Sequence, residues 1–309
     1  MRASVFWIGR LLGLAALLGV LAPGLAAKLQ VVATTTMVAD LARQVGEDAV
    51  EVEALMGAGV DPHLYKPTRR DIVALRRADV VLFNGLHLEG RMTDVLRVME
   101  GSGRPVAAIG EAVPEDLRLH PEAFEGHPDP HIWGDPLLWK RTVPAVVEAF
   151  AKADPANAAA YRERGQRAEA ELDALHAWAQ GRVDELPPER RVLITSHDAY
   201  NYFGRSFGFE VIGVQGISTV TEAGLADVAR LIDYIRDKKI PAIFVESSVS
   251  PRTIRRVSED SGAKVGGELF SDALGTLGDM AEAHGETYDL GTYRGMIKHN
   301  VNTIVDALK

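Results

Sequence analysis

Four side chains that can bind a metal ion each follow a predicted strand, in a loop or at the start of a helix: His63, His131, His197 and Asp272. Two of them stand in the same tripeptide, Asp-Pro-His, at residues 61–63 and 129–131. Proline fixes its own φ and favours extended geometry in the residue before it, so each of these imidazoles is held in a stiff turn. Because neutral imidazole is a common ligand of divalent transition metals, the repeated tripeptide predicts a metal ion shared by the two loops.

His197 and Asp272 complete a possible set of four ligands. His197 directly follows the strand predicted at 192–195, and Asp272 follows a strand predicted at 264–265. The sequence has no cysteine, so three imidazoles and one carboxylate form a site with only nitrogen and oxygen donors. No local motif such as HExxH is present. Glu246 ends the apolar strand predicted at 242–245, and we expect it to accept a hydrogen bond from a ligand imidazole.

Each of these residues also has a purely structural interpretation. A lone histidine is often only a hydrogen-bonded structural residue, and His197 could bond to the adjacent Asp198 at a helix start. Asp272 could cap the turn before Gly275, and Glu246 could cap the helix that follows Pro251. No proline precedes any of the remaining histidines, and we expect none of them to be a ligand: His87, His120, His127, His176, His284 and His299. His176 is expected to be solvated.

Short β-rich segments alternate with amphipathic helical segments along the whole chain. This alternation predicts an α/β fold of mostly parallel sheets flanked by helices. In the first half, strands are expected at 29–33, 50–55, 80–83 and 106–109, with helices at 34–45, from 68, and around 95–99. In the second half, strands are expected at 192–195, 210–214, 242–245 and 264–265, with helices at 199–207, 222–238, 251–261 and 288–308.

A long helix is predicted between the two halves. Asp154 and Pro155 suit the N-cap and the first helical position, and Pro187 with Pro188 ends the segment after about Glu185. Some 30 residues at 1.5 Å each give a rod of about 45 Å, too long for a small lobe. The predicted organisation is therefore an N-terminal lobe at 28–153, a linking helix at 154–186 and a C-terminal lobe at 187–309. Ligands of such folds bind in a cleft at the carboxyl ends of the strands.

The N-terminal segment and the composition predict where the protein acts. Residues 1–27 carry Arg2 and Arg10, an apolar run and small residues before a cleavage point after Ala26 or Ala27, as in a secretory signal peptide. Without cysteine we expect no lipid anchor, and hence a protein free in the periplasm. No later stretch approaches about 20 apolar residues, so the mature chain is not expected to insert into a membrane. The net charge of −9 disfavours nucleic acid as a partner.

Several motifs together resemble those of a known family, the periplasmic metal-binding receptors of zinc and manganese ABC importers (the cluster 9 or A-I solute-binding proteins). The resemblance covers residues 29–308. The motifs lie at 33–40 (ATTTMVAD), 59–68 (GVDPHLYKPT), 129–133 (DPHIW), 196–200 (SHDAY), 244–249 (FVESSV), 267–272 (GELFSD) and 292–296 (TYRGM), followed by His299 and Asn300.

The resemblance implies two lobes joined by one long helix, with a metal ion between them. The family's ligand positions match His63, His131, His197 and Asp272. Many manganese-dedicated members have glutamate at the third position, and many zinc members have a long histidine-rich loop that is absent here between Pro114 and His131. The pattern is most similar to members with three histidines and one aspartate, which handle manganese and zinc.

The predicted function is that of a periplasmic receptor that captures one manganese or zinc ion and delivers it to the membrane permease of an ABC importer. It requires no catalysis, and we expect a monomer. The alternative from another functional class is a metal-dependent hydrolase that uses the same cluster. A hydrolase would need an open coordination position and a general base, for which Glu246 or Glu268 is available.

Overall fold

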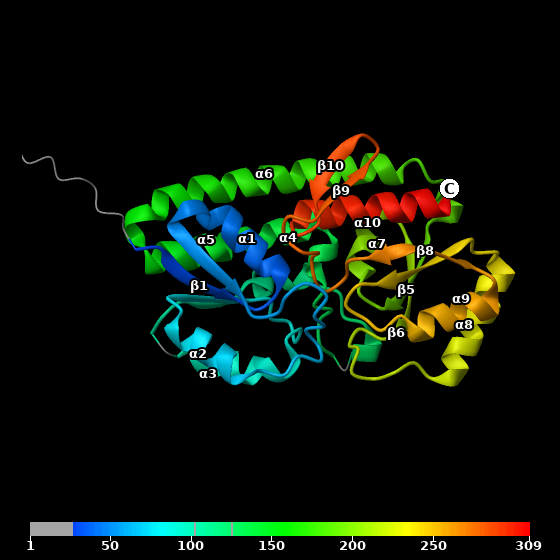
Figure 1. Cartoon of the computed structure of the whole chain (residues 1–309), viewed down its shortest axis with the longest axis horizontal. Coiled ribbons are helices and arrows are strands. Elements are labelled where there is room, and N and C mark those ends of the chain that lie inside the picture. The colour runs from blue at the N-terminus through cyan, green and yellow to red at the C-terminus, as the bar shows by residue number, and fades with distance from the viewer. Residues whose placement is uncertain (1–26, 102, 125) are drawn as a thin grey trace, which may run out of the picture.

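The computed structural model describes residues 27–101, 103–124 and 126–309. Apart from Ala27, the predicted signal peptide lies outside these residues. Two α/β lobes lie side by side, and one long helix runs along both of them (Figure 1). The predicted fold class is confirmed.

The N-terminal lobe is built on a parallel four-stranded sheet of order β2-β1-β3-β4. Neighbouring residues of its strands point to opposite faces: Val31 packs in one apolar cluster and Val32 in another. Both faces are therefore covered, as expected of a parallel sheet. The strands are β1 (Leu29–Ala33), β2 (Val50–Ala54), β3 (Val80–Phe83) and β4 (Val106–Ala108). The helices are α1 (Thr36–Gly46) and α5 (Val143–Ala153) on one face, and α2 (Arg69–Arg77) and α3 (Thr93–Glu100) on the other.

The C-terminal lobe contains two parallel strand pairs, β5–β6 and β7–β8, and β5 lies against β7. One face packs on α8 and α9 through residues such as Ile194 and Ile243, and the other contributes Phe244 to the core shared with α10. The strands are β5 (Val192–His197), β6 (Glu210–Gln215), β7 (Ala242–Glu246) and β8 (Lys264–Leu269). The helices are α7 (Asn201–Phe207), α8 (Leu225–Lys238), α9 (Arg252–Ser261) and α10 (Tyr293–Leu308).

The linking helix α6 spans Ala158–Val183, which is 26 residues or about 39 Å. It is shorter than predicted at both ends. A 3-10 turn at Pro155–Asn157 precedes it. The Asp154 carboxylate does not cap the helix, because it accepts hydrogen bonds from the side-chain amide of Asn157 and the hydroxyl of Tyr161. The short helix α4 (Pro136–Trp139) and α5 pack against α6.

The prediction for residues 280–292 is wrong. The segment forms an antiparallel hairpin of β9 (Met280–Ala283) and β10 (Glu286–Asp289), and α10 begins only at Tyr293 instead of Tyr288. His284 and Gly285 both have positive φ, which a two-residue type I′ turn requires. The Thr292 hydroxyl accepts the Gly295 amide and caps α10. The solvated position expected for His176 is also wrong, because its ring stacks on Phe207 at 5.1 Å and is half-buried.

The two halves share part of their core. Helix α10 packs on α6 and contacts α1, and the Tyr293 amide donates to the Asp40 carboxylate at 3.0 Å. The lobe boundaries at 153 and 187 therefore stay a prediction. Over the residues that the structure describes, no helix combines the length and apolar character needed to cross a bilayer.

Gly165 explains how closely α6 approaches α5. A Cβ atom at this position would lie 2.6 Å from Cγ2 of Val147, whereas one at Gly181 of the same helix would meet nothing within 4 Å. We predict that Gly165→Ala lowers the free energy of unfolding by about 1–3 kcal/mol through overpacking. Gly181→Ala is the matched control and should raise it by about 0.5–1 kcal/mol. Urea denaturation measures both, and equal effects would contradict the close-packing argument.

Candidate metal centre

The four predicted side chains come together between the lobes. One ligand atom from each of His63, His131, His197 and Asp272 lies within 4.8 Å of the others. The Nε2 atoms of His63 and His131 are 3.2 Å apart, and His197 Nε2 is 3.2 Å from an Asp272 oxygen. All four side chains are buried, with at most 5% of the residue exposed. Polar atoms this close and this buried require a bridging cation or proton.

The fold brings these residues together at the carboxyl ends of the strands of both lobes. His63 lies in the loop after β2, and His131 stands just before a 3-10 turn at Ile132–Gly134. His197 is the last residue of β5, whereas the sequence suggested that it follows the strand. Asp272 follows β8. Each lobe thus supplies two of the four side chains.

The aspartate of each Asp-Pro-His tripeptide fixes the turn that carries the histidine. Oδ1 of Asp61 accepts the His63 amide at 2.8 Å, and Oδ1 of Asp129 accepts the His131 amide at 2.9 Å. Asp129 Oδ1 also lies 2.8 Å from Nδ1 of His131, which leaves Nε2 directed at the cluster. The two prolines of the repeat predicted stiff turns, but the role of the two carboxylates was not predicted, although both aspartates are part of the repeat.

Glu246 orients His197. Its two carboxylate oxygens lie 2.8 Å from the His197 amide nitrogen and 2.5 Å from Nδ1 of the same residue. Glu246 therefore does not cap α9, whose N-terminus has no side-chain cap. A carboxylate behind an imidazole selects the tautomer whose Nε2 can bind a metal, and it raises the basicity of the ring.

Burial and charge act against each other on the titratable groups of the cluster. Burial alone would raise the pKa of Asp272, but His197 and His131 hold it well below its usual range. Burial alone would lower the pKa of His131, but Asp129 and Asp272 raise it to about 9. The pKa of His197 is raised well above its ordinary value because Glu246 and Asp272 outweigh its burial. Burial dominates at His63 and lowers its pKa to about 3.

Among the described residues, three buried atoms of the cluster have no hydrogen-bond partner outside it: both carboxylate oxygens of Asp272 and Nε2 of His197. Leaving such atoms unpaired in the interior costs about 1–3 kcal/mol each, and more for a charged group. A divalent cation at this point would contact all of them at once. The donor set therefore fits a borderline transition metal with nitrogen and oxygen ligands.

Both tripeptide aspartates also reach the opposite lobe. The second oxygen of Asp61 accepts a hydrogen bond from the Thr219 hydroxyl at 2.6 Å. The second oxygen of Asp129 accepts one from the side-chain amide of Asn201 at 3.1 Å. Beside them, Trp133 donates its indole N–H to the Ser271 carbonyl at 2.8 Å. Sequence reasoning did not find these contacts, since no local pattern links residues so far apart.

The remaining histidines lie outside the cluster and contact other groups. His120 pairs with Glu115 at 3.0 Å, His284 with Asp306 at 2.8 Å, and His299 with the Glu268 carbonyl at 2.8 Å. The rings of His87 and His127 lie against each other at a tilt of 38°, with centroids 3.8 Å apart. Together with His176 on Phe207, these contacts account for all six.

Comparisons with known proteins identify the family of this chain. A family model described as zinc-uptake complex component A, periplasmic, matches residues 31–307. The chain belongs to this family. Two known proteins resemble this chain over most of their length. The manganese-binding lipoprotein MntA of Bacillus subtilis is 44% identical, covering 91% of this chain and 90% of MntA. The zinc-binding protein TroA of Treponema pallidum is 42% identical, covering 90% of this chain and 88% of TroA.

A solved structure agrees with the family assignment. Periplasmic zinc-binding TroA of Treponema pallidum superposes with a TM-score of 0.85 at 41% identity, over 91% of this chain and 99% of that one. The resemblance inferred from the sequence motifs and the two-lobed fold are thus confirmed. Nothing in these comparisons supports the hydrolase alternative.

The expectation of a protein without a lipid anchor is wrong. MntA of Bacillus subtilis is named a lipoprotein, and so are SloC of Streptococcus mutans and PsaA of Streptococcus anginosus, each 26% identical to this chain. The expectation rested on the absence of cysteine from the sequence. That absence was an insufficient ground for excluding a lipid anchor.

Metal binding should depend steeply on pH. A cation needs neutral imidazoles, and the raised pKa values of His131 and His197 mean that both rings hold protons at pH 7 in the free protein. Binding therefore releases about two protons, and the affinity should fall by up to ~100-fold for each pH unit between 7 and 5. Calorimetry in buffers of different ionisation enthalpy counts the protons. An affinity that does not change with pH would contradict the assigned protonation states.

Replacing the carboxylate behind His197 should weaken metal binding without removing a ligand. Glu246→Gln leaves one of the two His197 N–H groups facing an amide N–H, so the imidazole is oriented less well. We expect the metal affinity to fall about 10–100-fold. Glu268→Gln is the matched control, because Glu268 is exposed and its side chain takes no part in the cluster. Equal affinities of the two variants in a competition titration would remove Glu246 from this role.

Proposed function

We propose that the protein captures a divalent transition metal ion between its lobes and delivers it to the permease of an ABC importer. The observation that carries the proposal is the buried meeting of His63, His131, His197 and Asp272 within 4.8 Å. The names of relatives support the transport role: SloC is a metal ABC transporter substrate-binding lipoprotein, and MntA and TroA are metal-binding proteins.

The proposed cargo is manganese or zinc. Three nitrogen donors in a compact cluster favour zinc over manganese by the Irving–Williams order. In the described part of the chain both Asp272 oxygens contact only the imidazoles of the cluster, so the carboxylate can bind through both and raise the coordination number, which suits manganese. The relatives differ in the same way, since MntA is named for manganese, TroA for zinc and YfeA of Yersinia pestis for iron.

The lobes at 28–153 and 187–309 are proposed to hold the ion between them, with residues 154–186 as the connection. We also propose that the protein acts as a monomer, which light scattering on the metal-loaded chain tests. A hydrolytic role is disfavoured because Glu246 already binds His197 through both oxygens, and Glu268 is exposed. Neither carboxylate is thus placed as a free general base beside the cluster.

Removing one imidazole tests the ligand set. We predict that His63→Ala lowers the affinity for Zn²⁺ and Mn²⁺ at least ~100-fold, because a four-ligand set loses one donor and part of its enclosure. His120→Ala is the control, as His120 lies outside the cluster on Glu115. Titration calorimetry measures the affinities, and the circular dichroism of both variants verifies the fold. Unchanged binding by His63→Ala would reject the proposed site.

The identity of the cargo is tested separately. Native mass spectrometry with metal quantification on protein purified from its own host should find one manganese or zinc ion per chain. A protein that carries no metal under conditions of metal sufficiency would contradict the proposed function.

A further inference from the structure

Helix α2 has a strongly basic exposed face in an acidic protein. Its sequence, RRDIVALRR, contains four arginines, and the whole chain has a net charge of −9. All four arginines are exposed: Arg69, Arg70, Arg76 and Arg77. Residues 69, 73 and 76 share one side of a helix, as do 70, 73 and 77, so the arginines surround Val73, which is 47% exposed. We call these five residues the arginine face.

The stability of α2 does not explain these arginines. Arg69 and Arg70 occupy its first turn, where the helix macrodipole disfavours positive charge. The only acidic residue of the helix, Asp71, is buried and accepts the Thr68 amide and the Tyr65 hydroxyl. Among the described residues only Arg70 of the four forms an ion pair, with Glu53 at 3.3 Å. Three positive charges on this face are thus free to meet a partner.

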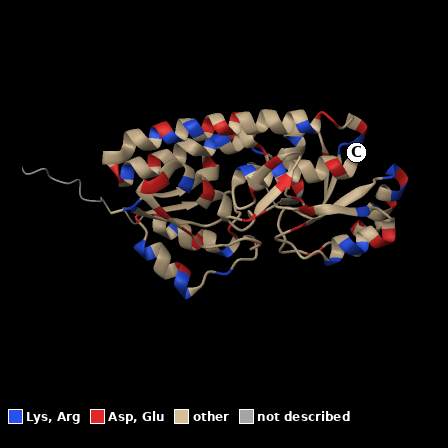
Figure 2. Ribbon diagram, turned by 45° about the horizontal axis from the view of Figure 1, so that its top comes forward, with Lys and Arg blue, Asp and Glu red and all other residues tan. Residues whose placement is uncertain are grey.

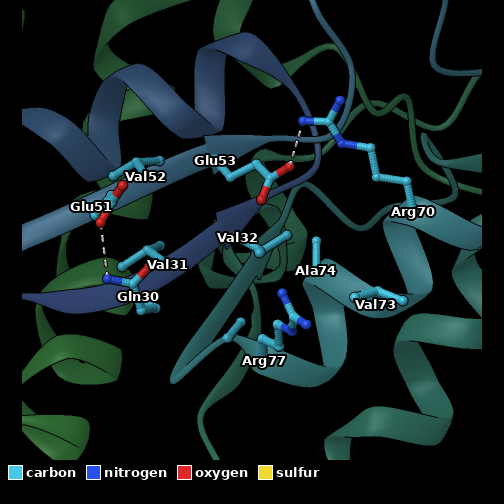
Figure 3. Close-up of a pocket in the computed structure, with 11 residues that line it drawn as sticks. Gln30, Val31, Val32, Glu51, Val52, Glu53, Arg70, Val73, Ala74 and Arg77 are labelled. Atoms are coloured by element: carbon cyan, nitrogen blue, oxygen red, sulfur yellow. Dashed lines mark hydrogen bonds and ion pairs between the residues drawn. The ribbon is translucent and has the colours of Figure 1, made fainter.

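A groove adjoins the arginine face. It has a volume of 570 Å³ and lies between α2 and the strands β1 and β2 (Figure 3). Arg70 and Arg77 stand on its helix side, whereas Glu51 and Glu53 project from the strand side. Strand β2 is the edge of the N-terminal sheet, so along its outer side no strand of the described chain pairs with it. The groove therefore offers charges of both signs beside the edge strand of the sheet.

The arginine face is directed away from the linking helix. Helix α2 lies across the sheet from α1 and α5, which pack against α6 (Figure 1). Figure 2 shows basic residues on this part of the N-terminal lobe, and others along the long helix and on the C-terminal lobe. None of the five residues belongs to the metal cluster. The face is therefore accessible while the two lobes enclose an ion.

We propose that the arginine face and its groove are a docking surface for a carboxylate-bearing segment of the partner permease. The inference rests on the proposed transport function. Carboxylates of the segment pair with Arg69, Arg76 and Arg77, and its backbone lies along the groove beside β2. Arginine is suited to this contact because its guanidinium group binds a carboxylate through two parallel hydrogen bonds.

The groove favours a protein segment over phospholipid headgroups. A bilayer surface is broad and uniformly negative, and Glu51 and Glu53 would be pressed against it. A polypeptide can place its own donors opposite these two carboxylates and its acids opposite the arginines, which is the charge complementarity that sets specificity and association rate.

The test compares two double charge reversals. Arg69→Glu with Arg76→Glu reverses the arginine face without breaking an ion pair of the described chain. Arg141→Glu with Arg162→Glu is the control, because both are exposed arginines on the α6 side and neither forms an ion pair among the described residues. Each metal-loaded protein is titrated against the purified cognate importer in phosphatidylcholine nanodiscs, against empty nanodiscs, and against nanodiscs with phosphatidylglycerol.

We expect the Arg69/Arg76 variant to bind the importer at least about tenfold more weakly than wild type, with less dependence on salt, while the control binds as wild type. Zinc affinity should be equal in all three proteins. Equal binding of the importer by all three would overturn the inference, and so would a loss seen only on phosphatidylglycerol nanodiscs, which would assign the face to lipid. A wild-type protein that binds no metal would instead reject the proposed function.

Discussion

The structure depends on holding three imidazoles and a carboxylate together where water is excluded. Isolated, each of these groups would be unfavourable in the interior, since desolvation opposes the charged form of every one of them. Their mutual attraction outweighs that cost at Asp272, His131 and His197. His63, where burial prevails, stays neutral. The cluster is thus arranged to exchange protons for a cation.

The surrounding structure supplies the rigidity that this exchange needs. Parallel sheets bring the ligand loops to the same edge, and carboxylates behind two of the rings fix which nitrogen faces the centre. The long helix packs closely enough on α5 that only glycine fits at residue 165. The cores of the two halves merge near Tyr293, so any change in lobe position has to disturb this shared packing.

The sequence predicted the fold class and the meeting of the four ligand candidates because these depend on strong local signals. Periodicity and β-branched runs located the eight parallel strands of the two lobes, and proline next to histidine indicated the loops. The hairpin at 280–289 was not predicted, because its strands have only four residues each and their hydrophobic pattern merges with that of the following helix. Contacts such as Asp61 with Thr219 require knowing which loops face each other, and no local rule supplies that knowledge.

The two Asp-Pro-His turns tie the ligand geometry to the separation of the lobes. In each, one carboxylate oxygen holds the turn of its own histidine and the other oxygen bonds to a residue across the cleft, Thr219 or Asn201. Separating the halves would break the hydrogen bond across the cleft and leave the carboxylate that holds the histidine turn less well fixed. The affinity for the metal ion and the closure of the lobes are therefore thermodynamically linked. A force that separates the two halves therefore also lowers the affinity for the bound ion, so the position of the lobes and the strength of binding change together.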